Sequence, residues 1–135
     1  MVRSKVDEAY AELLRNQAAI DAYGWQVSRD DQAIYVLMHP RQHPERKFML
    51  RIKCDDFDAR PPSYQFVDPA TKVVSVNHMP NGRGFIPAWP GVCIHGTREF
   101  YELGHRDYRI RWSSKEYPFA RVLQEIQVLI NQAYP

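Results

Sequence analysis

Cys93 lies where a reactive thiol would be expected in this 135-residue chain. Gly91 and Gly96 border it, and several prolines and glycines precede it, a composition typical of a loop. A cysteine thiolate is a strong nucleophile, and glycines on both sides let another chain approach the backbone closely. We therefore interpret Cys93 as the attachment point of an acyl group. An ordinary half-buried loop cysteine is the alternative interpretation of the same pattern.

Two histidines follow Cys93 and offer side chains for proton transfer. His95 is close to it in sequence, and a neutral imidazole near pH 7 suits orienting or deprotonating an attacking amine. His105 lies farther along the chain. Cys93, His95 and His105, together with His78, also form a candidate zinc set, although their spacing matches no specific zinc motif. For each histidine, the alternative is a solvated or hydrogen-bonded loop side chain.

The second cysteine and the composition narrow the class of protein. Cys54 ends an alternating strand pattern and is expected to be structural, and the two cysteines lack the spacing of a disulfide framework. The 18 basic and 16 acidic side chains show no dominant run, which argues against nucleic-acid binding. The N-terminus has no signal-peptide core, and no apolar run approaches the ~20 residues that span a bilayer. We expect a cytoplasmic protein with reduced thiols and no membrane partner.

The elements that position Cys93 are expected to form one α+β domain over residues 1–135. Ser4 and Asp7 have the spacing of a helix N-cap, and an amphipathic pattern continues for about four turns, ending before Gly24. Strand patterns follow at 25–28, 33–38, 47–54 and 63–67, the second of them apolar on both faces. They predict a four-stranded antiparallel meander behind the N-terminal helix.

The second half is expected to be mostly a long loop that carries the site, followed by a C-terminal helix. Residues 72–76 are a further candidate strand, and the prolines and glycines between 77 and 91 argue against regular structure. The last helix is predicted to begin near Ser113, with Glu116 at capping-box distance and Pro118 in the first turn. Apolar residues then recur at helical spacing, at 119, 122, 123, 126, 129 and 130.

This order of elements resembles the ubiquitin-conjugating enzyme fold. Residues 61–66 read Pro-Pro-Ser-Tyr-Gln-Phe and match the Pro-Pro-x-x-x-Phe signature of that family, with Phe57 in place of its usual Tyr. Residues 91–94, Gly-Val-Cys-Ile, are similar to the family's approach to its catalytic cysteine, and Trp112-Ser113 is similar to its Trp-Ser-Pro turn. Two C-terminal helices of the common form are missing, so the chain resembles short bacterial relatives that accompany ubiquitin-like proteins, sometimes in antiphage defence.

The resemblance implies a conjugating enzyme that carries a ubiquitin-like protein as a thioester on Cys93 and passes it to an amine. Its partners would be the modifier, an activating (adenylating) enzyme and the acceptor, and no cofactor is expected. The family's His-Pro-Asn corresponds at best to residues 78–81, His-Met-Pro-Asn, which makes Asn81 a candidate donor to the oxyanion. Asn81-Gly82 also fits a simple turn. Two other functions stay open: a non-catalytic module that binds a ubiquitin-like protein, and a small zinc-binding domain.

Overall fold

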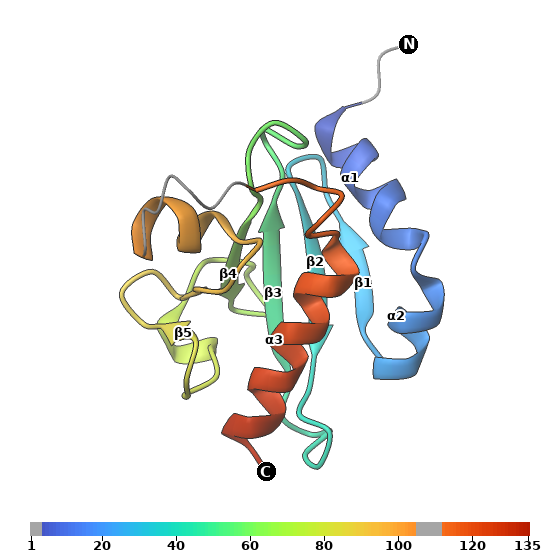
Figure 1. Ribbon diagram of the computed structural model, residues 1–135. Helices are drawn as coiled ribbons and strands as arrows, with labels where there is room; N and C mark the ends of the chain where they lie inside the picture. Colours follow the sequence, from blue (N-terminus) through green and yellow to red (C-terminus); the bar gives the residue numbers. More distant parts are fainter. Residues whose placement is uncertain (1–3, 105–111) are drawn as a thin grey trace.

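The computed structural model describes residues 4–104 and 112–135, with the N-terminal helices and the last helix packed against an antiparallel sheet (Figure 1). Two helices come first, α1 (Lys5–Leu14) and α2 (Gln17–Tyr23), and the long helix α3 (Phe119–Ala133) is the last element. One large core cluster contains side chains from α1, α2, the sheet and α3. These helices and one face of the sheet therefore enclose a common core, and the predicted α+β class is confirmed.

The N-terminal segment forms two helices where the sequence predicted one. The helix begins as predicted, because the Ser4 side chain accepts the Asp7 N–H and the Asp7 carboxylate accepts the Ser4 N–H. It ends at Leu14, and Asn16 leaves the helical conformation while its side-chain amide donates to the Glu12 carbonyl oxygen at 3.4 Å. An Asn side chain competes in this way for the hydrogen bonds of the helix backbone, and the amphipathic pattern does not reveal this effect. Gly24, at φ +70°, ends α2 as predicted.

Four strands form the predicted meander: β1 (Gln26–Arg29), β2 (Ala33–Met38), β3 (Phe48–Lys53) and β4 (Ser63–Val67). Each pairs antiparallel with the next, in a register that places Val36 beside Leu50 and Leu50 beside Phe66. Side chains alternate between the two faces of a strand, so these three residues share the helix-covered face. All three are fully buried. The alternation of apolar and polar residues at 47–54 thus predicted the buried face of β3 correctly.

The opposite face of β2 is also covered, as the apolar pattern predicted. Ala33 and Tyr35 are buried there against Val67, and Val74 packs on the same small cluster. Residues 68–75 fold back over this face, with one isolated bridge between Val67 and Val74. The predicted strand at 72–76 is therefore wrong. Lys72 has a φ of +62°, which is incompatible with an extended strand at this position.

The segment before Cys93 is more regular than the sequence predicted. It contains a short 3-10 turn, η1 (Val76–His78), and two short strands, β5 (Phe85–Ile86) and β6 (Gly91–Val92). They extend the sheet to the order β1-β2-β3-β4-β6-β5. The backbone N–H of Phe66 donates to the Pro90 carbonyl oxygen at 2.6 Å, which ties this segment to β4. Strands of two residues are too short to show a period of alternation, so no sequence pattern predicts them.

The C-terminal helix starts later than predicted. Ser113 and Glu116 form a turn, in which the Ser113 hydroxyl accepts the Glu116 N–H at 3.2 Å, instead of the first helical turn. Pro118 is the N-cap of α3, in an extended conformation. Because a proline disfavours the helical conformation of the residue before it, the helix does not begin at or before Tyr117. From Phe119 onward the apolar spacing holds, and Leu123 and Ile126 are fully buried.

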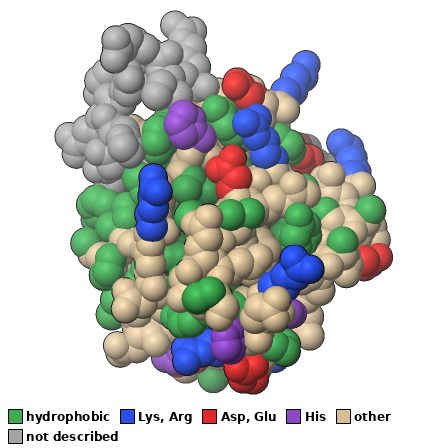
Figure 2. Space-filling model, turned by 60° about the horizontal axis from the view of Figure 1, so that its bottom comes forward, with side chains coloured by type: hydrophobic (Ala, Val, Ile, Leu, Met, Phe, Trp, Pro, Cys, Tyr) green, Lys and Arg blue, Asp and Glu red, His purple; other side chains and the backbone are tan. Residues whose placement is uncertain are grey.

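The surface shows no concentration of one charge sign on the face seen in Figure 2 among the described residues, since Lys and Arg side chains alternate there with acidic and uncharged ones. Hydrophobic side chains gather at the left of that view, on the side of the molecule where Figure 1 places β5. Within residues 4–104 and 112–135, no helix is long and apolar enough to cross a membrane.

Candidate functional site

Cys93 lies directly after β6, at the start of a tight bend that leads into the next helical turn. Its backbone N–H donates to the Gly84 carbonyl oxygen at 3.0 Å, which ties it to the segment before β5. The side chain is half-buried and the thiol is free. The sequence placed Cys93 outside the regular elements, and the structure agrees.

Thr97 holds the bend around Cys93. Its side chain is fully buried, and its hydroxyl lies 2.9 Å from the carbonyl oxygens of both Val92 and Ile94, the two neighbours of Cys93. The same oxygen accepts the backbone N–H of Phe100 at 3.2 Å. A single buried hydroxyl therefore fixes the backbone on both sides of the cysteine. Nothing in the local pattern distinguishes this threonine from a solvent-exposed loop residue.

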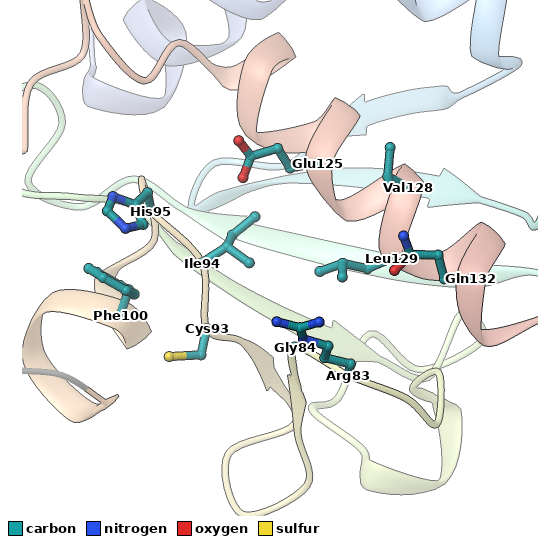
Figure 3. A pocket seen from close by; sticks show the side chains of 10 residues that line it. All are labelled: Arg83, Gly84, Cys93, Ile94, His95, Phe100, Glu125, Val128, Leu129 and Gln132. Carbon is teal, nitrogen blue, oxygen red and sulfur yellow. The ribbon is translucent and has the colours of Figure 1, made fainter.

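Beside Cys93 lies a hollow of about 580 Å³, open to solvent and bounded by α3 and by the segment around the cysteine (Figure 3). Its walls are mainly apolar, with polar groups at the rim; they include Ile94, Phe100, Leu129, Arg83, Glu125 and Gln132. In Figure 3, the Cys93 side chain points away from Leu129 and Arg83, so that the sulfur lies at one side of the hollow.

The two cysteines differ in environment. Burial, followed by the negative charge of Glu99, raises the pKa of the Cys93 thiol above its usual value. Cys54 is fully buried at the end of β3, and burial raises its pKa to about 12. Its thiol donates to the Ile52 carbonyl oxygen at 3.4 Å. Cys54 is therefore a packed core residue, as predicted, and Cys93 is the thiol that a reagent can reach.

His95 lines the same hollow as Cys93, but the hydrogen bond it makes is to Tyr117. Its Nδ1 lies 3.3 Å from the Tyr117 hydroxyl, and its ring centre is 4.3 Å from that of Phe100. The imidazole is exposed at the rim of the hollow. The structure thus brings together two of the four predicted site residues, Cys93 and His95. Their joint role in catalysis stays a prediction.

The other predicted site residues are not at the hollow. Asn81 is exposed, its backbone N–H donates to the Tyr134 hydroxyl at 3.2 Å, and it is not among the described residues that line the hollow. His105 lies outside the described residues. His78 bonds to the Ser75 hydroxyl through Nδ1 at 2.9 Å and lies on η1. In the described ranges, no three His, Cys, Asp or Glu side chains are grouped as a metal site would require.

Glu99 links the segment after Cys93 to the Pro-Pro motif, a role that no sequence pattern predicted. Its side chain is only 2% exposed. One carboxylate oxygen accepts the Ser63 hydroxyl at 2.5 Å, and the other accepts the backbone N–H of Tyr64 at 2.7 Å. Burial raises its pKa above the usual value, although these two hydrogen bonds act in the opposite direction. The carboxylate thus accepts a backbone hydrogen bond at the start of β4, as the carbonyl oxygen of a neighbouring strand would.

Two further ion pairs join the same parts of the chain. Arg98 donates to the Pro61 carbonyl oxygen and to the Asp55 carboxylate, both at 2.9 Å. Glu102, in the π-helical turn η2 (Glu99–Gly104), accepts two hydrogen bonds from the Arg60 guanidinium, at 2.7 and 2.6 Å. The loop before β4 is therefore the support for the segment after Cys93. The two motifs that the sequence singled out separately form one structural unit.

No protein-family model and no curated protein matches this sequence. The function is therefore inferred from the residues of the site and from their positions.

Proposed function

We propose that the chain is a conjugating enzyme that carries a ubiquitin-like protein as a thioester on Cys93 and passes it to an amine acceptor. The observation that supports this most is the contrast between the two thiols. Cys93 stands on a bend held by Thr97, at the side of an open hollow of about 580 Å³, whereas Cys54 is sealed in the core. A thioester carrier needs one accessible cysteine, a rigid backbone beneath it and space for the carboxyl terminus that it receives.

The reaction consists of two acyl transfers. The Cys93 thiolate attacks the carbonyl carbon of the thioester on the activating enzyme, a new C–S bond forms, and the activating enzyme's cysteine leaves as a thiolate. The acceptor amine then attacks the same carbonyl carbon. A C–N bond forms, the bond to the Cys93 sulfur breaks, and the proton lost by the amine returns to the released sulfur or to water.

The raised pKa of Cys93 fits a carrier better than a hydrolase. A thiol of higher pKa is the poorer leaving group, so its thioester resists attack by water. The burial and the Glu99 charge that raise the pKa of Cys93 would thus slow the hydrolysis of its thioester. The raised pKa also means that only a small fraction of Cys93 is in the thiolate form before loading.

The proposed partners are a ubiquitin-like modifier, an activating enzyme and an amine-bearing acceptor, in a bacterial cytoplasmic system such as one of those in antiphage defence. The Lys5 side chain of α1 and the Arg15 side chain at its C-cap are both exposed. The hollow beside Cys93, which no α1 residue lines among the described residues, is left for the modifier's carboxyl terminus. Loading and substrate transfer would then use different surfaces of the domain.

A direct test first offers the protein a ubiquitin-like protein prepared as its C-terminal mercaptoethanesulfonate thioester. A second arm supplies a complete system of a ubiquitin-like modifier, its activating enzyme and ATP. We expect an adduct on a non-reducing gel that disappears with reducing agent. Cys93→Ala abolishes it, and the matched variant Cys54→Ala keeps it. Absence of an adduct in the complete system, or equal labelling of the protein unfolded in urea, contradicts the proposal.

One observation favours a second candidate, a non-catalytic module that binds a ubiquitin-like protein. Burial and the Glu99 charge both raise the pKa of the Cys93 thiol, and neither is a neighbouring cation that would stabilise the thiolate. A binding module would use the hollow without the thiol. Affinity for the modifier that survives Cys93→Ser, together with no adduct under any condition, supports this candidate instead.

A further inference from the structure

A second pocket, of about 330 Å³, lies between the end of α2, the loop after β2 and α3. Its lining consists of Ala22, Tyr23, His39, Arg41, Gln127 and Asn131. We propose that this pocket binds a small organic carboxylate, with the carboxyl group held by the Arg41 guanidinium and the Asn131 side-chain amide. The site is separate from the hollow beside Cys93, and the proposal does not rest on the chemistry of that thiol.

A chain of hydrogen bonds with fixed directions forms the inner wall of the pocket. Gln127 is only 3% exposed, and its Oε1 accepts the indole N–H of Trp25 at 2.9 Å. Its Nε2 donates to the His39 carbonyl oxygen at 2.8 Å and to the Asn131 Oδ1 at 3.0 Å. An indole N–H can only donate and a carbonyl oxygen can only accept, so the Gln127 amide has one possible orientation.

The orientation of the Asn131 amide follows from that of Gln127. Its Oδ1 accepts the Gln127 side-chain N–H and also the backbone N–H of Arg41, the latter at 2.8 Å. A side-chain amide has one oxygen and one NH₂ group, so the NH₂ group of Asn131 is left as a donor. Within residues 4–104 and 112–135, this NH₂ group has no hydrogen-bond partner. The fold therefore holds a spare donor in a fixed position at the wall of the pocket.

His39 adds one acceptor to the same wall. Its Nδ1 lies 2.9 Å from the Pro40 carbonyl oxygen, which can only accept, so the proton of the neutral ring is on Nδ1. Nε2 is then an acceptor, and it lies beside the turn after α2, since a Cβ at position 24 would be 3.5 Å from it. A hydroxyl group on the ligand can donate to this nitrogen.

The charge of the pocket suits a ligand with a single negative charge. Arg41 is exposed, and its guanidinium has no ion pair within the described part of the chain. Among the described residues, no Asp, Glu or Lys lines the pocket. The carbonyl oxygens of Ile20 and Asp21 at the end of α2 would repel an anion, but they accept the N–H groups of Trp25 and Gly24. A guanidinium offers two parallel N–H groups to the two oxygens of a carboxylate.

The remaining lining suits a small apolar body. The Tyr23 ring stacks on Trp25, with 5.0 Å between the ring centres and 12° between the planes. Tyr23 and Ala22 therefore give the pocket an apolar side opposite the polar groups of α3 in the sequence of the lining. A volume of about 330 Å³ is near the lower end of the range for small-molecule sites. A short acid fits this space better than a protein segment does.

The first experiment titrates ¹⁵N-labelled protein with mandelate, which carries a carboxylate, a hydroxyl and a ring. NMR follows the NH₂ signals of Asn131 and the indole N–H of Trp25. We expect saturable shifts with a dissociation constant of roughly 1 mM, as for small ligands of this size. Mandelamide, which has an uncharged amide in place of the carboxylate, should bind at least about tenfold more weakly. Equal affinity for mandelamide, or tighter binding of inorganic phosphate, overturns the assignment to a carboxylate. Absence of shifts with both mandelate and lactate overturns the site.

The second experiment repeats the titration with variants of the two proposed contacts. Arg41→Gln should weaken mandelate binding roughly 10- to 100-fold, as for loss of a hydrogen bond to a charged group. Asn131→Asp keeps the Oδ1 acceptor but replaces the NH₂ group with an oxygen that repels the ligand, and it should abolish binding. Binding to Asn131→Asp at the wild-type affinity overturns the proposal.

Arg46→Gln is the matched control, because Arg46 is in the same loop and does not line the pocket. Its guanidinium lies over the Tyr134 ring at 4.8 Å. We expect this variant to bind mandelate as the wild type does. A loss of affinity equal to that of Arg41→Gln would mean that mandelate responds to the general charge of the surface, and the site would be overturned.

Discussion

The Glu99 carboxylate accepts the backbone N–H of Tyr64 at 2.7 Å, and through this bond the segment after Cys93 is attached to the start of β4. The two residues are 35 positions apart in sequence. The bond gives a buried backbone donor its partner and at the same time places a negative charge near the thiol. One side chain thus contributes to the fold, to the shape of the site and to the state of the nucleophile.

Glu99 should make the stability of the protein depend on pH. Its pKa is raised in the folded state, so the folded protein holds this proton more tightly than the unfolded chain. The stabilisation is complete below the unfolded value and is lost as pH rises through the folded value. In urea unfolding between about pH 5 and pH 8, the wild type should therefore lose stability relative to Glu99→Gln. Parallel profiles for the two proteins would contradict this expectation.

A matched variant separates the charge of Glu99 from its hydrogen bonds. In Glu99→Gln the amide oxygen can still accept the Tyr64 N–H, and the amide nitrogen can donate to the Ser63 hydroxyl oxygen. In Glu99→Ala the Tyr64 N–H is left buried without its partner, at a cost of about 1–3 kcal/mol. We expect the alanine variant to be the less stable of the two at every pH.

The reactivity of the two thiols should differ sharply and should respond to Glu99. Iodoacetamide at about pH 8, where a free thiol is partly ionised, should modify Cys93 well before Cys54, whose thiol is fully buried with a pKa of about 12. Cys93 should react more slowly than a free cysteine and faster in Glu99→Gln, because the charge that raises its pKa is gone. Peptide mass mapping after timed labelling measures each rate. Labelling of Cys54 at the rate of Cys93 would show that the core is not closed.

Thr97→Val should loosen the bend around Cys93. The substitution conserves shape but removes the hydroxyl shared by the Val92 and Ile94 carbonyl oxygens, at a cost of about 1–3 kcal/mol in unfolding free energy. Thr97→Ser retains the hydroxyl and should cost less. Urea midpoints give the stability, and the iodoacetamide rate of Cys93 gives the local effect. If Thr97→Val is as stable as Thr97→Ser, the hydroxyl does not hold the bend.

Gly96→Ala should be more damaging than an ordinary loop substitution. Gly96 has a φ of +99°, and a Cβ there would lie 2.6 Å from the Val122 Cγ2 atom on α3. We expect a loss of roughly 1–3 kcal/mol from the strained backbone alone, and a shift of the Tyr117 side chain. Chemical denaturation measures the loss of stability. The NMR signals of His95, which is hydrogen-bonded to the Tyr117 hydroxyl, report the shift of the Tyr117 side chain. An unchanged midpoint would mean that α3 can move away from the bend.

Sequence patterns predicted the parts of this fold that repeat over several residues. The alternation in β3, the two-sided apolar run of β2 and the helical spacing after Phe119 each extend over enough positions to indicate type and buried face. The patterns failed where a single side chain decides the backbone, and where a strand is very short. Asn16 divides the first helix, Pro118 delays the last one, and β5 and β6 are too short to show any period.

For the site, the sequence singled out Cys93, His95, His105 and Asn81, and the structure places the first two at the hollow. A cysteine between glycines and a nearby imidazole are recognisable from residue type. What surrounds them was decided by tertiary structure. Thr97, Glu99 and Tyr117 act through contacts with backbone and side chains that only folding brings near, such as Tyr64 in β4. Residue types along a chain show which reactions their side chains can take part in. The partners of a buried hydroxyl or carboxylate, by contrast, depend on packing between distant segments.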